Sequence, residues 1–168
     1  MALVSGWPAT AATRMSEHHA EVLRKLYDAF NRRDMGALLE CLDPEVEIDE
    51  TEDLAYAAQL LRVLGPRFVI LSGGYHGHEE VRTLFETVWE ISDRFVVEPD
   101  DFMEAGETVI LSLAMRARAR DSGVQGEAHT VHLWTMKDGR GSRLRVYAHR
   151  DEALRAAALE DAADQRSS

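Results

Sequence analysis

Polar and aromatic side chains suited to acid–base chemistry gather in one stretch, "HTVHLWTMKDGRGSRLRVYAH", residues 129–149. Its two runs around a Gly-rich turn predict a pair of antiparallel strands. Because side chains alternate along a strand, His132 and Trp134 share one face of the first strand, and Tyr147 and His149 share one face of the second. An unperturbed histidine has a pKa of about 6.5, so both histidines are candidate proton donors or acceptors near neutral pH.

The elements that must position these residues begin with helices. Apolar residues recur at helical spacing after Glu21, which predicts a helix that buries Val22, Leu23, Leu26, Tyr27 and Phe30. A shorter helix is predicted over 35–42, and another over about 53–64, where "GP" closes it. The most regular pattern, over 78–93, predicts a helix that buries Val81, Leu84, Phe85, Val88 and Trp89.

After this helix the hydrophobic period changes to two. Turn signals divide residues 94–149 into four runs, which predict an antiparallel meander. The alternating "EVEIDE" (45–50) predicts an earlier strand, "SGGYHG" (72–77) a turn, and 151–159 a closing helix. Helices followed by a meander are typical of an α+β fold, with helices on one face of a curved sheet. In "TVILSLAM" (108–115) both strand faces are largely apolar, so we expect a homodimer joined through the convex face.

Composition bounds the class of protein. The chain has 168 residues, and we expect an arm over 1–18, one domain over 19–160 and a frayed tail over 161–168. Its net charge of -11 disfavours nucleic acid and anionic membranes as partners. No run approaches the roughly 18 apolar residues of a membrane span, and no secretory signal is evident, so a cytoplasmic protein is expected. The single cysteine, Cys41, fits a buried structural thiol better than a nucleophile.

Four strings, in this order, carry a resemblance to a known family: "AFNRRDMGALLECLDPEVEID", "YHGHEEVRTLFETVW", "HLWTMKDGR" and "RVYAHRDEAL". With their intervening segments, covering roughly residues 20–160, they resemble the SnoaL-like branch of the nuclear transport factor two-like superfamily, which also contains ketosteroid isomerase. The resemblance implies a cone-shaped, curved mixed or antiparallel sheet with the N-terminal helices packed on its concave face, a cystatin-like α+β barrel. It also implies a pocket for a small, often apolar ligand, without identifying that ligand.

Compared with ketosteroid isomerase, the chain keeps a carboxylate and lacks the oxyanion pair. The position that resembles the isomerase base falls on Glu50. The position of the oxyanion tyrosine falls on Leu26, and that of the oxyanion aspartic acid on His132, so carbonyl–enol isomerisation by that route is disfavoured. By the same resemblance, the side chains expected to line the pocket are Tyr27, Asp49, Trp89, Trp134 and Tyr147.

The SnoaL cyclases and related hydrolases suggest another arrangement, in which an acid–base residue on the last strand faces a histidine on the neighbouring strand. His132 fits the histidine, and His149 stands where the acid–base residue is expected. The catalytic set that the resemblance implies is therefore His132 with Glu50 or His149, for isomerisation, aldol-type cyclisation or epoxide opening. A limonene-epoxide-hydrolase-like arrangement would use Arg145, but two inward carboxylates near it are not evident.

Several of these residues have structural alternatives. His132 fits a hydrogen-bonded core histidine, and Trp134 fits a residue that fills volume. His76 and His78, two apart, could suggest a metal, but acids at the start of the following helix explain "GYHGHEE" better, and we expect no metal or cofactor. The segment 51–72 is longer than in small family members, and could close the pocket or pad the dimer.

Two functions from different classes follow. In the first, the protein is a cofactor-independent isomerase, cyclase or hydrolase that acts on a small apolar or polyketide-like molecule. In the second, it is a non-catalytic ligand-binding or structural homodimer module of the same fold. His132 and Glu50 discriminate between them: convergence on one cavity favours the enzyme, and burial against backbone partners favours the module.

Overall fold

The computed structural model describes residues 15–49, 62–65 and 74–167. The chain begins with helices α1 (Met15–Asn31) and α2 (Met35–Glu40), followed by strands β1 (Leu42–Asp49) and β2 (Gly74–His76) and helix α4 (Gly77–Ile91). Strands β3 (Ser92–Ala105), β4 (Thr108–Ala119), β5 (Gln125–Lys137) and β6 (Arg140–Tyr147) follow, and helix α5 (Arg150–Ser167) ends the fold. The described part of the segment 53–64 is helical at 62–64.

The strands form one six-stranded sheet in the order β2-β1-β6-β5-β4-β3. Neighbours from β3 to β6 pair antiparallel, as a meander should, whereas β1 pairs with β6 in parallel. The sheet is therefore mixed, and it is curved but not closed. The expected α+β class, with a curved mixed sheet and N-terminal helices on the concave face, is confirmed.

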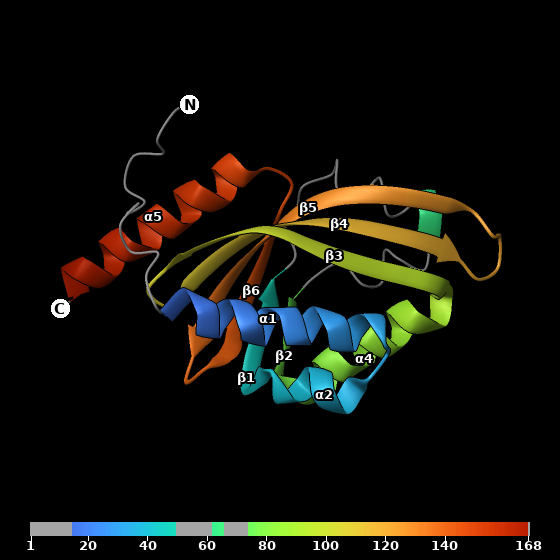
Figure 1. Ribbon diagram of the computed structural model, residues 1–168, viewed down its shortest axis with the longest axis horizontal. Helices are drawn as coiled ribbons and strands as arrows, with labels where there is room; N and C mark the ends of the chain where they lie inside the picture. The colour runs from blue at the N-terminus through green and yellow to red at the C-terminus, as the bar shows by residue number, and fades with distance from the viewer. Residues whose placement is uncertain (1–14, 50–61, 66–73, 168) are drawn as a thin grey trace.

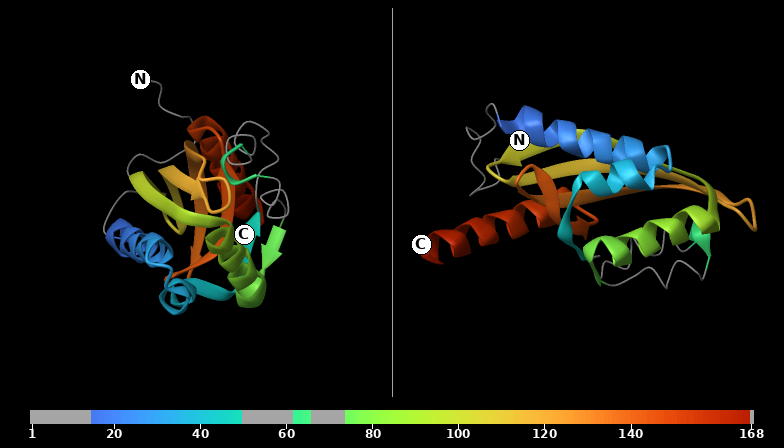
Figure 2. Two further views of the ribbon diagram at one scale, coloured as in Figure 1. Left: turned by 90° about the vertical axis from the view of Figure 1, so that its right-hand side faces the viewer. Right: turned by 90° about the horizontal axis from the view of Figure 1, so that it is seen from below.

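Helices cover both faces of the sheet (Figure 1). We call the face toward α1, α2 and α4 the inner face, and the face toward α5 the outer face; the turned views show the same arrangement (Figure 2). The inner face contributes Val109, Leu111, Leu113 and Met115 of β4 to the main core, which they share with α1 and α4. On the outer face, Ile110, Val131 and Leu133 pack against Ala153, Leu154 and Ala157 of α5.

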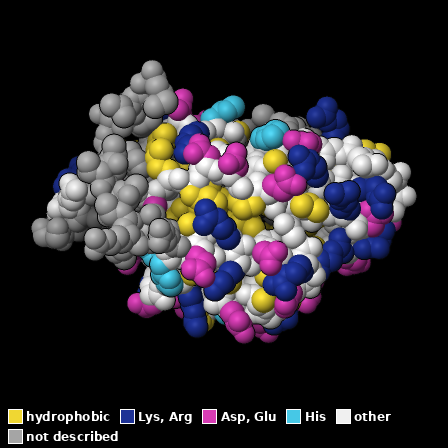
Figure 3. Space-filling model, in the orientation of Figure 1, with side chains coloured by type: hydrophobic (Ala, Val, Ile, Leu, Met, Phe, Trp, Pro, Cys, Tyr) yellow, Lys and Arg dark blue, Asp and Glu magenta, His cyan; other side chains and the backbone are white. Residues whose placement is uncertain are grey.

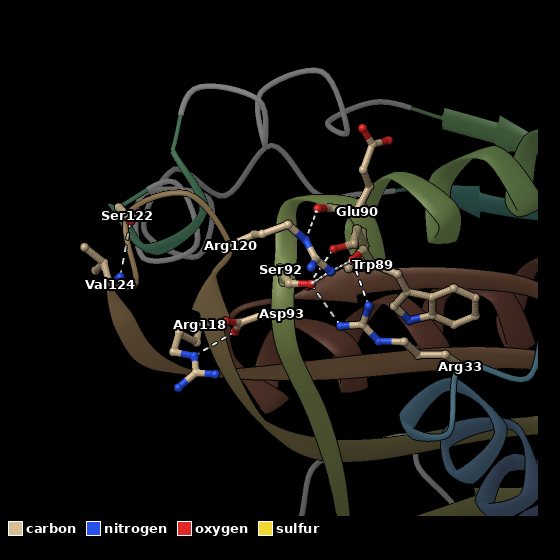
Figure 4. A network of polar contacts seen from close by, with 10 residues as sticks. Arg33, Trp89, Glu90, Ser92, Asp93, Arg118, Arg120, Ser122 and Val124 are labelled. Carbon is tan, nitrogen blue, oxygen red and sulfur yellow. Dashed lines mark hydrogen bonds and ion pairs between the residues drawn. The ribbon is translucent and has the colours of Figure 1, made fainter.

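Two arginines fix the end of α4 against the sheet. Arg33, in the turn after α1, donates to the carbonyl oxygens of Trp89 (2.8 Å) and Ser92 (2.9 Å). Arg120, just after β4, donates to the same two carbonyls and to that of Glu90. Figure 4 shows both guanidinium groups converging on this helix end. Cations suit the negative end of a helix dipole, so this clamp sets where α4 stops and β3 starts.

Some sequence-based boundaries need correction. "SGGYHG" was expected to be a turn, but Gly74–His76 forms strand β2, which pairs with β1 through Tyr75 and Ile48. The closing helix was expected over 151–159 with a tail after 160, whereas α5 runs to Ser167. Helix α1 starts at Met15, within the expected arm. The sequence also predicts a short strand over "RFVIL" (67–71), which lies outside the described residues.

The outer face is more covered than the sequence suggested. Ile110, one of the residues that argued for a sheet-to-sheet homodimer, is completely buried beneath α5 of the same chain. Farther from α5, charged pairs occupy this face: Arg116 contacts Glu98 and Glu127, and Arg118 contacts Asp93. Basic and acidic side chains also lie next to each other on the face shown in Figure 3.

Candidate functional site

Tyr27, His132 and Trp134 form a buried hydrogen-bonded triad between α1 and β5. The indole Nε1 of Trp134 donates to the Tyr27 hydroxyl oxygen at 2.8 Å, and that oxygen lies 2.7 Å from Nδ1 of His132. The fold brings these groups together because His132 and Trp134 alternate onto the inner face of β5, and α1 buries the stripe that contains Tyr27. All three side chains are at least 94 % buried, with His132 the most exposed at 6 %.

The direction of the hydrogen bonds sets the tautomer of His132. The Trp134 indole can only donate, so the Tyr27 oxygen is an acceptor toward Trp134. If His132 also donated to that oxygen, the Tyr27 O–H would have no acceptor among the described residues. Buried hydroxyl groups are rarely left without a partner, so Tyr27 donates to Nδ1 of His132. His132 therefore carries its proton on Nε2, and that N–H is the group it can offer to a ligand.

Burial fixes the protonation states of the triad. Desolvation lowers the pKa of His132 from its ordinary value of 6.5 to about 3, so the imidazole is neutral at physiological pH. Burial also raises the pKa of the Tyr27 phenol, against the opposing effect of the Trp134 hydrogen bond. With this pKa the imidazole stays neutral near pH 7, and the acid–base role expected for His132 stays a prediction. The arrangement suits a neutral hydrogen-bond donor.

Gly141 leaves the space that the Trp134 ring occupies. The sequence analysis did not identify this residue. Gly141 faces Trp134 from β6, and a Cβ built on it would lie 2.6 Å from Cζ3 of Trp134 and 3.3 Å from a Leu42 methyl carbon. No side chain larger than hydrogen fits there without moving the indole, so Gly141 indirectly supports the bond from Trp134 to Tyr27. The available signal was the second glycine of "KDGRGS", which the turn itself does not require.

Trp89, an expected pocket residue, lies on α4 in a different part of the main core. Its ring packs against Phe30 (centroids 5.6 Å apart) and Phe85 (6.4 Å). Phe95 packs edge-on against Phe30 and extends this aromatic cluster onto β3. The Nε1 atom of Trp89 is buried and has no hydrogen-bond partner in the described structure. An unpaired buried N–H is uncommon, so Trp89 offers a possible donor to a ligand but no contact with the triad.

Three expected site residues lie away from the triad. Tyr147 of β6 points to the outer face of the sheet, where it packs with the cluster under α5. Asp49 also takes the outer parity, and its carboxylate lies 3.1 Å from Nη2 of Arg143. His149 is exposed just before α5. Tyr147 and Asp49 therefore point away from the face that carries the triad, His149 is exposed, and Glu50 lies outside the described residues.

Arg145, considered for epoxide hydrolysis, also has the outer parity. Its Nη2 lies 2.5 Å from Oε2 of Glu160 on α5, so the pair joins the last helix to β6. Its side chain is 14 % exposed. This position removes Arg145 from any inner-face site.

Metal ligation finds no support in the described residues, which contain no group of three or more histidine, cysteine, aspartate or glutamate side chains suited to one ion. His76 lies 3.1 Å from Glu45, and His78 contacts the carbonyl of Leu42. The two histidines thus have separate partners.

Of the cavities lined by described residues, the two described below are not lined by the triad. One, of about 530 Å³, includes Glu98, Ser112 and His129 and lies along β3, β4 and β5. The other, of about 350 Å³, lies between Val63, Ile91 and the turn after β4. Val63 sits directly over Gly126, where a Cβ would lie 2.2 Å from a Val63 methyl carbon.

Comparison with known proteins agrees with this architecture. The family model described as the SnoaL-like domain matches residues 23–144. No curated protein matches the chain.

Solved structures share the fold. An NTF2-like protein of unknown function from Burkholderia pseudomallei is 25 % identical, with a TM-score of 0.63 over 82 % of this chain and 95 % of that one. TerC, co-crystallised with polyporic acid, is 21 % identical, with a TM-score of 0.62 over 82 % and 98 %. A candidate SnoaL-like polyketide cyclase from Jannaschia sp. CCS1 is 14 % identical, with a TM-score of 0.61 over 78 % and 85 %.

Proposed function

Because this chain belongs to the family of SnoaL-like domains, we propose that it binds a small, largely apolar or polyketide-like molecule and acts on it without a cofactor. His132 is the residue that we assign to the chemistry, as a neutral hydrogen-bond donor. The reaction class is acid–base: an isomerisation, an aldol-type cyclisation or a hydrolysis.

The observation that carries this proposal is the chain of hydrogen bonds from Trp134 through Tyr27 to His132. Because Nδ1 of His132 is occupied by Tyr27, Nε2–H is the end that a ligand can meet. A fixed donor of this kind stabilises negative charge that develops on a carbonyl oxygen when a proton is removed next to it. Such stabilisation is strongest in an environment that excludes water, which the burial of the triad supplies.

The base in this scheme is Glu50, as the resemblance to ketosteroid isomerase implies. Glu50 follows β1 in the sequence and lies outside the described residues. His149 no longer competes for this role because it is exposed before α5. The proposed division of labour is therefore Glu50 as proton acceptor and His132 as donor to the oxygen.

Two of the relatives support a small organic ligand. TerC was co-crystallised with polyporic acid, and the protein from Jannaschia is named as a candidate polyketide cyclase. Trp89, with its unpaired N–H among aromatic rings, is a further candidate for ligand contact on the inner side.

Native mass spectrometry of the purified protein tests the proposal. We expect a retained small molecule as an added mass on the wild-type chain, and its loss in His132→Leu. Tyr147→Phe is the matched control, because Tyr147 lies on the outer face, and it should retain the molecule. Equal retention by His132→Leu, with an unchanged melting temperature, would remove His132 from ligand binding.

The alternative is a non-catalytic binding or structural module, and the burial of His132 favours it, since its ring is 94 % buried and bonded to Tyr27. The Glu50→Gln variant, compared with the wild type, distinguishes the two functions. Ligand retention with loss of turnover indicates the enzyme, whereas retention with no turnover by the wild type indicates the module.

Homodimer formation stays a prediction, with a smaller apolar surface to support it because α5 covers Ile110. The described helices include none long and apolar enough to cross a membrane. The net charge of -11 continues to disfavour nucleic acid as a partner.

A further inference from the structure

A second buried polar pair lies between α1 and β3, and the acid–base scheme above does not use it. Nδ1 of His19 contacts Oε1 of Glu104, and both side chains are 5 % exposed. Glu104 stands opposite Val109 of β4, which in turn stands opposite Trp134 of β5, so all three lie in one row across the inner face. The pair therefore belongs to the interior between the helices and the sheet.

One oxygen of this carboxyl group has no partner. Oε2 of Glu104 is buried and makes no hydrogen bond in the described structure. A buried carboxyl oxygen without a partner is costly, because it has lost its water and gained nothing in return. Burial raises the pKa of Glu104, and the hydrogen bond from His19 opposes that change. Such an orphan atom indicates a position that something else completes.

The surroundings restrict the chemistry of that partner. His19 already contacts one oxygen of the carboxyl group, so only the second oxygen is left for a ligand. A neutral hydroxyl can donate to a carboxylate or accept from a carboxylic acid, so it suits either protonation state. The adjacent buried side chains on the sheet and on α1, Val109 and Leu23, are apolar. The position therefore suits a hydroxyl attached to an apolar body.

We propose that Glu104 and His19 form a binding subsite, separate from the triad of Tyr27, His132 and Trp134, in which Oε2 of Glu104 hydrogen-bonds the hydroxyl group of a small, otherwise apolar molecule. His19 is the positioning residue, because it holds Oε1 and leaves Oε2 for the ligand. Along α1, eight residues separate His19 from Tyr27, which is about 12 Å of helix. The subsite thus lies near the start of α1, where His18 adjoins the turn at Gly139.

Phenol and toluene are the matched probes, because they differ by a hydroxyl in place of a methyl group. In NMR titrations of the full chain, we expect phenol to shift the His19 imidazole and Glu104 amide resonances saturably. Toluene should leave them unchanged. Glu104→Gln should weaken phenol binding about tenfold, the effect of losing a hydrogen bond to a charged group.

Two control variants separate this site from other effects. Glu107→Gln changes an exposed carboxylate in the following turn and should bind phenol like the wild type. His132→Asn should also leave the response at Glu104 intact, even if it abolishes the function proposed for the triad. Equal shifts with toluene, or no shift at Glu104 with phenol at tens of millimolar, would overturn the subsite and leave Oε2 to water alone. The comparison of the two probes needs no variant, so it remains decisive if Glu104→Gln does not fold.

Discussion

His132 differs from an exposed histidine in two properties, a fixed tautomer and a suppressed charge. Tyr27 holds Nδ1, and burial lowers the pKa of the imidazole to about 3. A neutral imidazole is a weaker acid than imidazolium, but it can donate a hydrogen bond over the whole physiological pH range. The chemistry at this position is therefore expected to depend on the ionisation of its carboxylate partner, and not on that of His132.

The suppressed pKa predicts a specific loss of stability in acid. Below pH 6.5 the unfolded chain protonates residue 132, whereas the folded chain stays neutral until about pH 3. The contribution of His132 to the free energy of unfolding is thus fully present above pH 6.5. It falls as the pH drops below that value, by up to about 1.4 kcal/mol per pH unit. Between pH 7 and pH 5, the free energy of unfolding measured with urea should fall by about 2 kcal/mol more in the wild type than in His132→Asn. Equal decreases would mean that His132 titrates normally in the folded protein.

Removal of the Tyr27 hydroxyl tests the triad directly. Tyr27→Phe leaves the Trp134 N–H and Nδ1 of His132 without partners, so we expect the free energy of unfolding to fall by about 3 kcal/mol. The same change at half-buried Tyr147, whose hydroxyl has no hydrogen-bond partner in the described part of the chain, should cost less than about 0.5 kcal/mol. Similar losses in the two variants, measured by urea unfolding, would contradict the assigned hydrogen bonds.

At the scale of elements, the clamp on α4 is a long-range feature that joins three parts of the chain. Arg33 and Arg120 are far apart in sequence, yet they share the carbonyls of Trp89 and Ser92. Burial lowers the pKa of Arg33, with a further contribution from Arg120, which reflects the cost of placing two cations together. The helix end offsets that cost with its unpaired carbonyl groups.

Replacement of Arg33 should loosen this helix end without unfolding the protein. For Arg33→Met we expect a loss of about 1–2 kcal/mol and faster amide hydrogen exchange at the junction of α4 and β3, since Arg120 keeps part of the clamp. Arg94→Met, on the same junction but exposed, is the control and should change neither quantity. The clamp has no role in stability if the two variants behave alike.

The elements that periodicity predicted best are those with one buried face. The stripe from Leu23 to Phe30 identified α1, and the change to period two identified the meander of β3 to β6. On β5 the inner parity of His132 and Trp134 was predicted and is confirmed. Strand β2 has only three residues, too few to show a period of two. It forms because these residues pair with β1, which the local sequence does not reveal.

Register explains why the strand pattern alone could not assign a face to every expected site residue. On β6 both parities are partly buried, with Leu144 and Val146 inward and Tyr147 under α5, so the sequence offered no contrast between faces. A shift of one residue exchanges the faces, so the expected place of Tyr147 in the pocket rested on the resemblance and not on the strand pattern. His19 and Glu104 were missed for another reason: they are 85 residues apart, and only the packing of α1 on β3 brings them together.

At the scale of the whole molecule, α5 decides which surface is available to partners. It covers Ile110, Val131 and Leu133, and Glu160 attaches it to Arg143 and Arg145. The apolar strip that would favour association of two sheets is therefore covered by α5 of the same chain. Charged pairs lie on the outer face farther from α5, so a dimer formed through them should weaken as salt concentration rises.

Removal of α5 should therefore change both stability and assembly. A chain that stops after His149 exposes Ile110, Val131 and Leu133, which are almost completely buried in the full structure. Loss of this apolar contact should cost about 3 kcal/mol or more, and the exposed strip should drive self-association that raises the mass seen by light scattering. A chain that stops after Gln165 keeps Ala153, Leu154, Ala157 and Glu160, so it should match the full chain in urea unfolding and in mass. If the shorter chain has the same stability and mass as these two, α5 does not cover a surface prone to association.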